Sequence, residues 1–183
     1  MKNLLDLAIA IQQIPAPTFA EKKRGEFVHQ LFVEEGLDEI STDGAGNIYG
    51  KYPGKGMGAP LVICAHLDTV FPAQTDLRIA RDPNRITGPG IGDNSLAVAA
   101  MPILIQMLRE KNIQPLGDIW LVATTGEEGL GNLRGMRAVV DRFEDSPVVY
   151  LALEGMALGY IYHRALGVRR YRISASTEGG HSW

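Results

Sequence analysis

The chain has 183 residues, of which 45% are hydrophobic and 21% are charged, a composition that excludes a disordered or collagen-like protein. The 18 Lys and Arg residues and the 21 Asp and Glu residues give a net charge of −3, and no basic run is present. Since phosphate backbones require clustered positive charge, we expect no nucleic-acid partner. Cys64 is the only cysteine, which excludes an intrachain disulfide and a cysteine-built zinc site, and fits a reducing compartment.

The first part of the chain predicts two helices. The apolar opening segment is interrupted by Asp6 and lacks a small-residue cleavage site, so it predicts an amphipathic helix rather than a signal peptide. A second helix is predicted over 18–36, with Thr18 as its N-cap and Glu21 three residues on. No apolar stretch approaches the roughly 20 residues that span a bilayer, so we expect a cytoplasmic protein without membrane association.

Three continuous apolar runs predict the core strands of a sheet. Such runs are typical of strands buried on both faces. The runs cover 61–65, 118–124 and 147–153, helical patterns over 95–111 and 133–143 lie between them, and strand-like runs flank the turn DGAGN at 43–47. The turn predicts a β-hairpin. The alternation of strands with helices predicts the α/β class, with a mostly parallel sheet and helices on both faces.

The pattern changes near the end of the chain. Apolar and polar residues alternate over 168–176, which predicts a strand with one covered face. We therefore expect one domain over 1–165 and the beginning of a second over 166–183. Too few residues follow to bury the apolar side of this strand, so we expect the second domain to be truncated.

Polar residues gather where the core strands end. His66 and Asp68 follow the first run, Glu127 and Glu128 the second, and Glu154 the third, while Asp93 lies in the loop GIGDN. Open α/β sheets bind ligands at the edge where the carboxyl ends of their strands meet, so we expect these side chains to converge. Converging carboxylates repel one another unless a cation lies between them.

The spacing of His66 and Asp68 favours a metal ligand. Residues two apart on a strand point to the same side, so Asp68 can orient the imidazole while its other nitrogen faces the metal. Histidine nitrogen together with carboxylate oxygen makes zinc the first candidate, and cobalt or manganese could replace it.

The glycine-rich loop GPGIGD at 88–93 leaves a second interpretation open. A phosphate-binding loop also contains closely spaced glycines, but this loop lacks the lysine of a P-loop and contains Pro89. A nucleotide-binding α/β domain would bind phosphates and be indifferent to chelators.

Five motifs occur in a fixed order: HLDTV at 66–70, GPGIGDN at 88–94, TTGEEGLGNLRG at 124–135, LALEG at 151–155 and GGHSW at 179–183. In order and context they resemble the M20 family of dinuclear zinc peptidases and deacylases. The resemblance covers nearly the whole chain. It implies hydrolysis of an amide bond in a small peptide or an N-acyl amino acid, with an aminopeptidase of the tripeptidase type slightly favoured. It also implies a homodimer for the full-length protein.

The resemblance implies a role for each site residue. His66 and Glu154 would bind one zinc ion, Asp93 would bridge two, Glu128 would bind the second, Asp68 would hold His66, and Glu127 would be the general base. A cis peptide bond would follow Asp93. His181, in a lid or dimerisation domain that begins at 166, would stabilise the oxyanion in the partner subunit.

One expected residue is missing. A late histidine completes the second zinc site in the family, and neither histidine after Glu154 matches its position, which leaves Asp93 and Glu128 as the protein ligands of that ion. We therefore expect a truncated chain whose own activity is in question. The alternative is a catalytically incompetent metal-binding fragment or regulatory module of the same fold.

Overall fold

A five-stranded sheet forms the centre of the computed structural model, which describes residues 3–155, 158–169, 171 and 173–181. The strand order is β1 (Asp38–Thr42), β2 (Ile48–Tyr52), β6 (Ile119–Thr124), β3 (Leu61–His66) and β7 (Val149–Ala152). Strands β6, β3 and β7 are parallel, and the predicted hairpin β1–β2 adds two antiparallel strands beside β6. The three apolar runs and the turn were thus assigned correctly.

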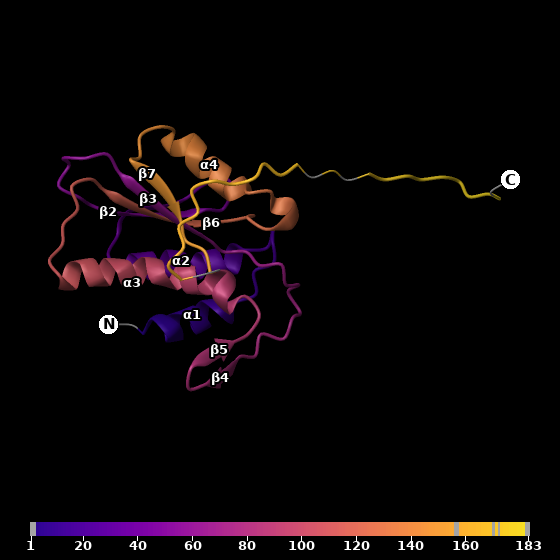
Figure 1. Cartoon of the computed structure of the whole chain (residues 1–183), viewed down its shortest axis with the longest axis horizontal. Helices are drawn as coiled ribbons and strands as arrows, with labels where there is room; N and C mark the ends of the chain where they lie inside the picture. The colour runs from indigo at the N-terminus through magenta and orange to yellow at the C-terminus, as the bar shows by residue number, and fades with distance from the viewer. Residues whose placement is uncertain (1–2, 156–157, 170, 172, 182–183) are drawn as a thin grey trace.

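Helices cover both faces of this sheet (Figure 1). The helices are α1 (Leu4–Gln12), α2 (Lys22–Glu34) and α3 (Leu96–Glu110) on one side and α4 (Arg134–Phe143) on the other. Since successive strand residues point to opposite faces, Ile63 and Ala65 of β3 pack in the core with α1 to α3, while Val62 and Cys64 pack in the core with α4. Burial on both faces explains the continuous apolar runs and confirms the predicted α/β class.

The remaining elements surround the entry to α3. Strands β4 (Ala80–Asp82) and β5 (Arg85–Thr87) form a separate two-stranded hairpin, and η1 (Ile91–Ser95) leads directly into α3. The side-chain amide of Gln12 donates to the carbonyls of Leu77 (3.1 Å) and Pro89 (2.9 Å). The end of α1 therefore holds both ends of the loop that carries this hairpin.

Helix α2 begins later than predicted. Its N-cap is Glu21, and the Thr18 hydroxyl donates to the Asp68 carboxylate (2.9 Å) instead of capping the helix. The prediction of a Thr18 cap was therefore wrong. The physical reason is that α2 begins at Lys22, four residues after Thr18, so the Thr18 hydroxyl is not at the capping position and donates its hydrogen to a buried carboxylate, which is a strong acceptor.

One helical segment in the described part of the chain, Ile91–Glu110, has the length and composition of a membrane span. This corrects the expectation that no apolar stretch approaches that length. Half of the segment is buried inside the protein, and Val98, Met101 and Ile105 are fully buried in the core. Because α3 packs against α1 and β3, its apolar character is that of a core helix.

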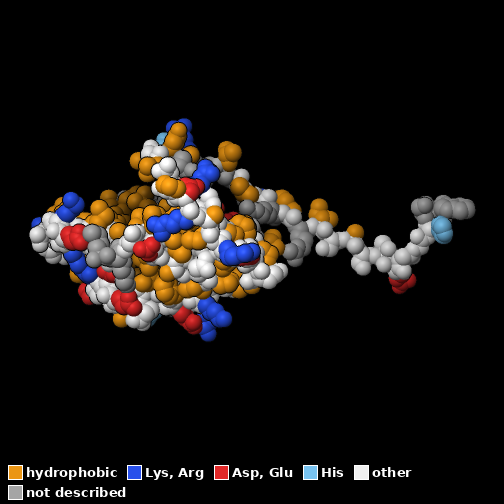
Figure 2. Space-filling model, turned by 90° about the horizontal axis from the view of Figure 1, so that it is seen from below, with side chains coloured by type: hydrophobic (Ala, Val, Ile, Leu, Met, Phe, Trp, Pro, Cys, Tyr) orange, Lys and Arg blue, Asp and Glu red, His pale blue; other side chains and the backbone are white. Residues whose placement is uncertain are grey.

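The chain after β7 leaves the domain as an extended segment (Figures 1 and 2). The strand predicted over 168–176 is absent from the residues that the structure describes there, which are 168–169, 171 and 173–176. Apolar side chains along this segment, such as Leu166 and Ile173, are almost fully exposed. Alternation predicts which side of a strand is apolar, but a strand also needs a neighbour for its backbone groups, and no strand pairs with the described residues of this segment.

Candidate metal centre

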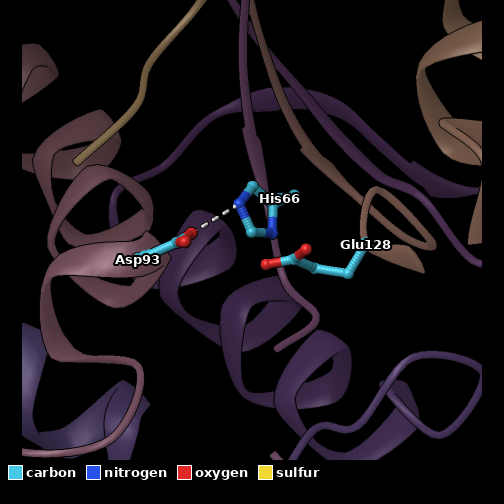
Figure 3. Close-up of side chains that lie close together, drawn as sticks. All are labelled: His66, Asp93 and Glu128. Atoms are coloured by element: carbon cyan, nitrogen blue, oxygen red, sulfur yellow. Dashed lines mark ion pairs between the residues drawn. The ribbon is translucent and has the colours of Figure 1, made fainter. Parts of the chain in front are cut away.

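Four predicted site residues meet at the carboxyl edge of the sheet. His66 ends β3, Glu128 and Glu154 follow β6 and β7, and Asp93 lies in η1. In Figure 3 the side chains of His66, Asp93 and Glu128 point toward one another. His66 Nε2 lies 3.0 Å from Asp93 Oδ1 and 3.6 Å from Glu154 Oε2. As the resemblance implies, the peptide bond between Asp93 and Asn94 is cis.

The spacing of these donor atoms suits a metal ion. Zinc binds nitrogen and oxygen at about 2.1 Å, which places neighbouring tetrahedral ligands about 3.4 Å apart. The distances from His66 to Asp93 and Glu154 are close to that value. One ligand atom from each of His66, Asp93 and Glu128 lies within 4.8 Å of the others. The residues present therefore fit a metal site.

The hydrogen bonds of His66 select the nitrogen that can bind a metal. Nδ1 lies 2.9 Å from the backbone carbonyl of Asp68, and because a carbonyl only accepts, Nδ1 carries a hydrogen and donates it. Nε2 is therefore the nitrogen available to a metal. Burial lowers the pKa of His66, but its hydrogen bonds and charge interactions with Asp68 and Glu154 outweigh burial and raise it to about 11. In the metal-free site the imidazole is protonated, and a metal ion must displace that proton.

Asp68 contacts the loop that carries Glu127 and Glu128 as well as His66. Its carboxylate is completely buried and accepts hydrogen bonds from the backbone N–H groups of Glu127 and Glu128 (3.0 Å each) and from the Thr18 hydroxyl. Burial raises the pKa of Asp68, but the hydrogen bonds with His66 and with these donors outweigh it and lower the pKa to about 2. Its carboxylate Oδ1 is 3.6 Å from the imidazole Nδ1, so it is the backbone carbonyl that accepts the shorter bond from His66.

The two adjacent glutamates of the loop after β6 both have a raised pKa. For Glu127 the main cause is burial, and the negative charges of Glu154, Asp68 and Asp93 raise its pKa further, while His66 opposes them. Burial also raises the pKa of Glu128. A carboxylate with a raised pKa accepts a proton more readily, which is the property that a general base needs.

Two further residues accept hydrogen bonds from the backbone of this loop and were not predicted as site residues. Asn47 Oδ1 accepts from the N–H group of Thr125 (3.0 Å), and Glu21 Oε1 accepts from that of Gly126 (2.9 Å). Asn47 lies in the polar turn DGAGN, which was interpreted as a hairpin turn. Glu21 was interpreted as part of a helix cap, and no local pattern reveals a partner 105 residues away.

Close backbone packing places Glu154 beside the η1 loop. The Asn94 amide donates to the carbonyl of Leu153 (2.8 Å), directly before Glu154. On the other side, a Cβ atom on Gly155 would collide with the carbonyl of Gly92. Only glycine at 155 allows this approach, so β7 ends against the loop that carries the candidate bridging aspartate.

His181 lies apart from this cluster. It is exposed and lies outside any helix or strand. Its role at a partner subunit therefore remains a prediction from the resemblance.

The loop over 88–92 lacks the setting of a phosphate-binding loop. It follows β5 of the small hairpin and not a strand of the central sheet, whereas a P-loop connects a core strand to a helix. The glycines instead shape the entry to η1.

The fold and the clustered donors define an α/β domain with a candidate metal site at the carboxyl edge of its sheet. Residues 62–172 match the model of peptidase family M20/M25/M40, and the chain belongs to this family.

Three similar proteins place the chain within the family. Over 140 residues it is 28% identical to the Bacillus subtilis protein YqjE, named as uncharacterised, covering 69% of this chain and 37% of YqjE. It also resembles the crystal structure of aminopeptidase PepT from Bacillus cereus (27% identity, TM-score 0.70), covering 82% of this chain and 42% of PepT. A tripeptidase from Staphylococcus aureus matches at 26% identity and a TM-score of 0.69, over 84% and 43% of the two chains. The chain thus spans less than half the length of each of them.

Proposed function

We propose that this chain contains the catalytic domain of a metal-dependent hydrolase that cleaves an amide bond of a small peptide or an N-acyl amino acid. The convergence of His66, Asp93 and Glu128 beside a loop with a second glutamate carries the proposal. The likeness to an aminopeptidase and a tripeptidase favours peptides over N-acyl amino acids. We assign residues 1–165 to this domain and 166–183 to the start of a lid or dimerisation domain.

The proposed cofactor is a pair of zinc ions, for which cobalt or manganese could substitute. His66 and Glu154 would hold one ion, Glu128 the other, and Asp93 both. When bound, such ions lower the pKa of water and polarise the carbonyl of the scissile amide.

The proposed general base is Glu127, whose carboxylate takes a proton from the attacking water and passes it to the leaving amine. Two features support this role: its raised pKa and the Asp68 carboxylate that fixes its backbone N–H group. His181 of a partner subunit would stabilise the oxyanion in a homodimer. We further propose that the enzyme is cytoplasmic.

Hydrolysis assays test this function. The wild-type chain and Glu127→Gln are loaded with zinc, cobalt or manganese and given tripeptides and N-acyl amino acids, and released amine is measured. We expect wild-type turnover to be at least about 100-fold faster than that of the variant, because the amide cannot accept a proton. A wild-type chain that binds metal without hydrolysing any of these compounds would indicate the alternative, a catalytically incompetent metal-binding fragment or regulatory module. Equal rates for both proteins would refute the role of Glu127.

A further inference from the structure

The loop that carries both glutamates is held by side chains from distant parts of the chain. Each of four consecutive backbone N–H groups donates to a side-chain oxygen. The bonds run from Thr125 to Asn47 Oδ1 (3.0 Å), Gly126 to Glu21 Oε1 (2.9 Å), Glu127 to Asp68 Oδ1 (3.0 Å) and Glu128 to Asp68 Oδ2 (3.0 Å). The loop conformation thus depends on acceptors supplied by three other segments.

Among these acceptors, Asn47 and Glu21 have no role in the proposed chemistry, and Glu21 is the one that carries a charge. It is 4% exposed and lies directly before α2. Its Oε1 accepts from the N–H groups of Phe19 (3.0 Å) and Gly126, and its Oε2 lies 3.5 Å from Nη2 of Arg134. One oxygen therefore serves the backbone and the other faces a guanidinium.

Glu21 bonds to Gly126, a loop residue whose backbone conformation is not fixed by a side chain of its own. Gly126 has a φ of +60° and no side chain, and a Cβ atom there would lie 2.6 Å from Nε of Arg134. Glycine adopts many backbone conformations, so its N–H group needs an external acceptor to stay in one of them. A carboxylate in a buried site supplies a strong one.

We propose that Glu21 is a positioning residue for Glu127 and Glu128, acting through the N–H group of Gly126. The roles of those two glutamates rest on the proposed function, whereas the restraint on the loop does not. The hydrogen bond requires an oxygen at the place of Oε1. It does not require the negative charge.

Two conservative variants separate oxygen from charge. Glu21→Gln keeps an acceptor at Oε1 and loses the charge, and Arg134, which is 40% exposed, can turn its guanidinium toward water. Glu21→Asp keeps the charge but withdraws the oxygen by about 1.5 Å, the length of one carbon–carbon bond. In both variants the carbonyls of Thr125 and Gly126 keep the hydrogen bonds that they accept from the N–H groups at the start of α4.

A matched control exists at the other end of the same helix. Glu35 follows α2, is 8% exposed, and accepts from the side-chain amide of Gln106 on α3 (2.6 Å). Glu35→Gln therefore changes a buried glutamate on the same helix without touching the loop.

Amide hydrogen exchange by NMR on the metal-free chain tests the restraint directly. For Glu21→Asp we expect the Gly126 N–H group to exchange about tenfold faster than in the wild type, which corresponds to about 1.4 kcal/mol. Exchange within β3 and β6 should stay unchanged. Glu21→Gln and Glu35→Gln should keep the wild-type rate at Gly126. Equal Gly126 rates in Glu21→Asp and the wild type, or a faster rate in Glu21→Gln than in Glu21→Asp, would overturn the proposal.

Cobalt affinity provides the second readout, because Glu128 is a proposed ligand on the same loop. We expect the dissociation constant to rise about fivefold to tenfold in Glu21→Asp and to stay within about twofold in Glu21→Gln, since an oxygen at Oε1 restrains the loop. A wild-type chain that binds no cobalt would contradict the proposed function, while the exchange rates would still decide the role of Glu21. Unchanged affinity in Glu21→Asp would refute the link from Glu21 to the metal ligand.

Discussion

Replacing Asp68 by Asn exchanges one carboxylate oxygen for an NH₂ group at the centre of the loop network. The carboxylate accepts three hydrogen bonds, from the N–H groups of Glu127 and Glu128 and from the Thr18 hydroxyl. An asparagine has one oxygen and one NH₂ group, so in either orientation one of the two backbone N–H groups faces a second donor. The substitution preserves shape and removes one acceptor.

The free-energy cost can be worked out in two ways from the same hydrogen bonds. A buried N–H group without an acceptor costs about 1–3 kcal/mol. The pKa of Asp68 is lowered from 3.8 to about 2, and at about 1.4 kcal/mol for each pKa unit the native state favours the ionised carboxylate by roughly 2 kcal/mol. We therefore expect Asp68→Asn to reduce the free energy of unfolding by about 2–3 kcal/mol.

The same shift defines a pH window. A carboxyl group whose pKa is lower in the folded state stabilises the fold fully above its unfolded pKa, and that stabilisation is lost as the pH falls through the folded pKa. For Asp68 the window runs from about pH 4 down to about pH 2. The difference between wild type and Asp68→Asn should be constant from pH 5 to pH 8 and disappear below that window.

Urea unfolding of the metal-free chain measures this difference. Thr18→Val is the control, because it removes one hydroxyl donor to the same carboxylate and should cost only about 1 kcal/mol. A free energy of unfolding of Asp68→Asn within about 0.5 kcal/mol of the wild-type value at pH 7 would refute the reasoning. A difference in this free energy that grows as the pH falls toward 2 would refute it as well.

Three further outcomes are expected. The raised pKa of His66, about 11, keeps the metal-free imidazole protonated, so zinc must displace one proton when it binds. Competition with a chelator should therefore show a zinc affinity that rises about tenfold per pH unit between pH 6 and pH 8. A zinc affinity that does not change with pH would contradict this. Gly155→Ala should destabilise the chain by about 1–3 kcal/mol and weaken metal binding, because the new Cβ atom meets the carbonyl of Gly92. Calorimetric scans with and without zinc measure both effects. An unchanged melting temperature would show that the packing at this position is loose. Burial raises the pKa of the Cys64 thiol to about 12, so a thiol reagent should label it only in urea, and rapid labelling of the native chain would show that β3 is not buried.

The sequence correctly predicted the strands that are buried along their whole length. Strands β3 and β6 are buried on both faces, so a continuous apolar run identifies each of them. The strand predicted over 168–176 is absent from the residues described there, because alternation carries no information about a neighbouring strand. The residues that follow the core strands lie at one edge of the sheet, as predicted, because the carboxyl ends of parallel strands meet there.

The hydrogen bonds that support the site could not be predicted from short sequence patterns. Thr18 and Glu21 resemble a helix cap in sequence, yet their oxygens bond to Asp68 and to the backbone of Gly126. Asn47 reaches Thr125 across 78 residues. Such contacts form only after the sheet has assembled, so a sequence pattern a few residues long does not contain them.

The metal content of the purified chain tests the central claim most directly. Elemental analysis of protein prepared without chelator should find about two zinc ions per chain in the wild type, and Asp93→Ala should lose at least one of them because this residue is the proposed ligand of both ions. Asp82→Ala, which changes an exposed aspartate of β4, should retain the wild-type content. A wild-type chain without metal, or an Asp93→Ala variant with undiminished zinc, would contradict a metal centre built on these residues.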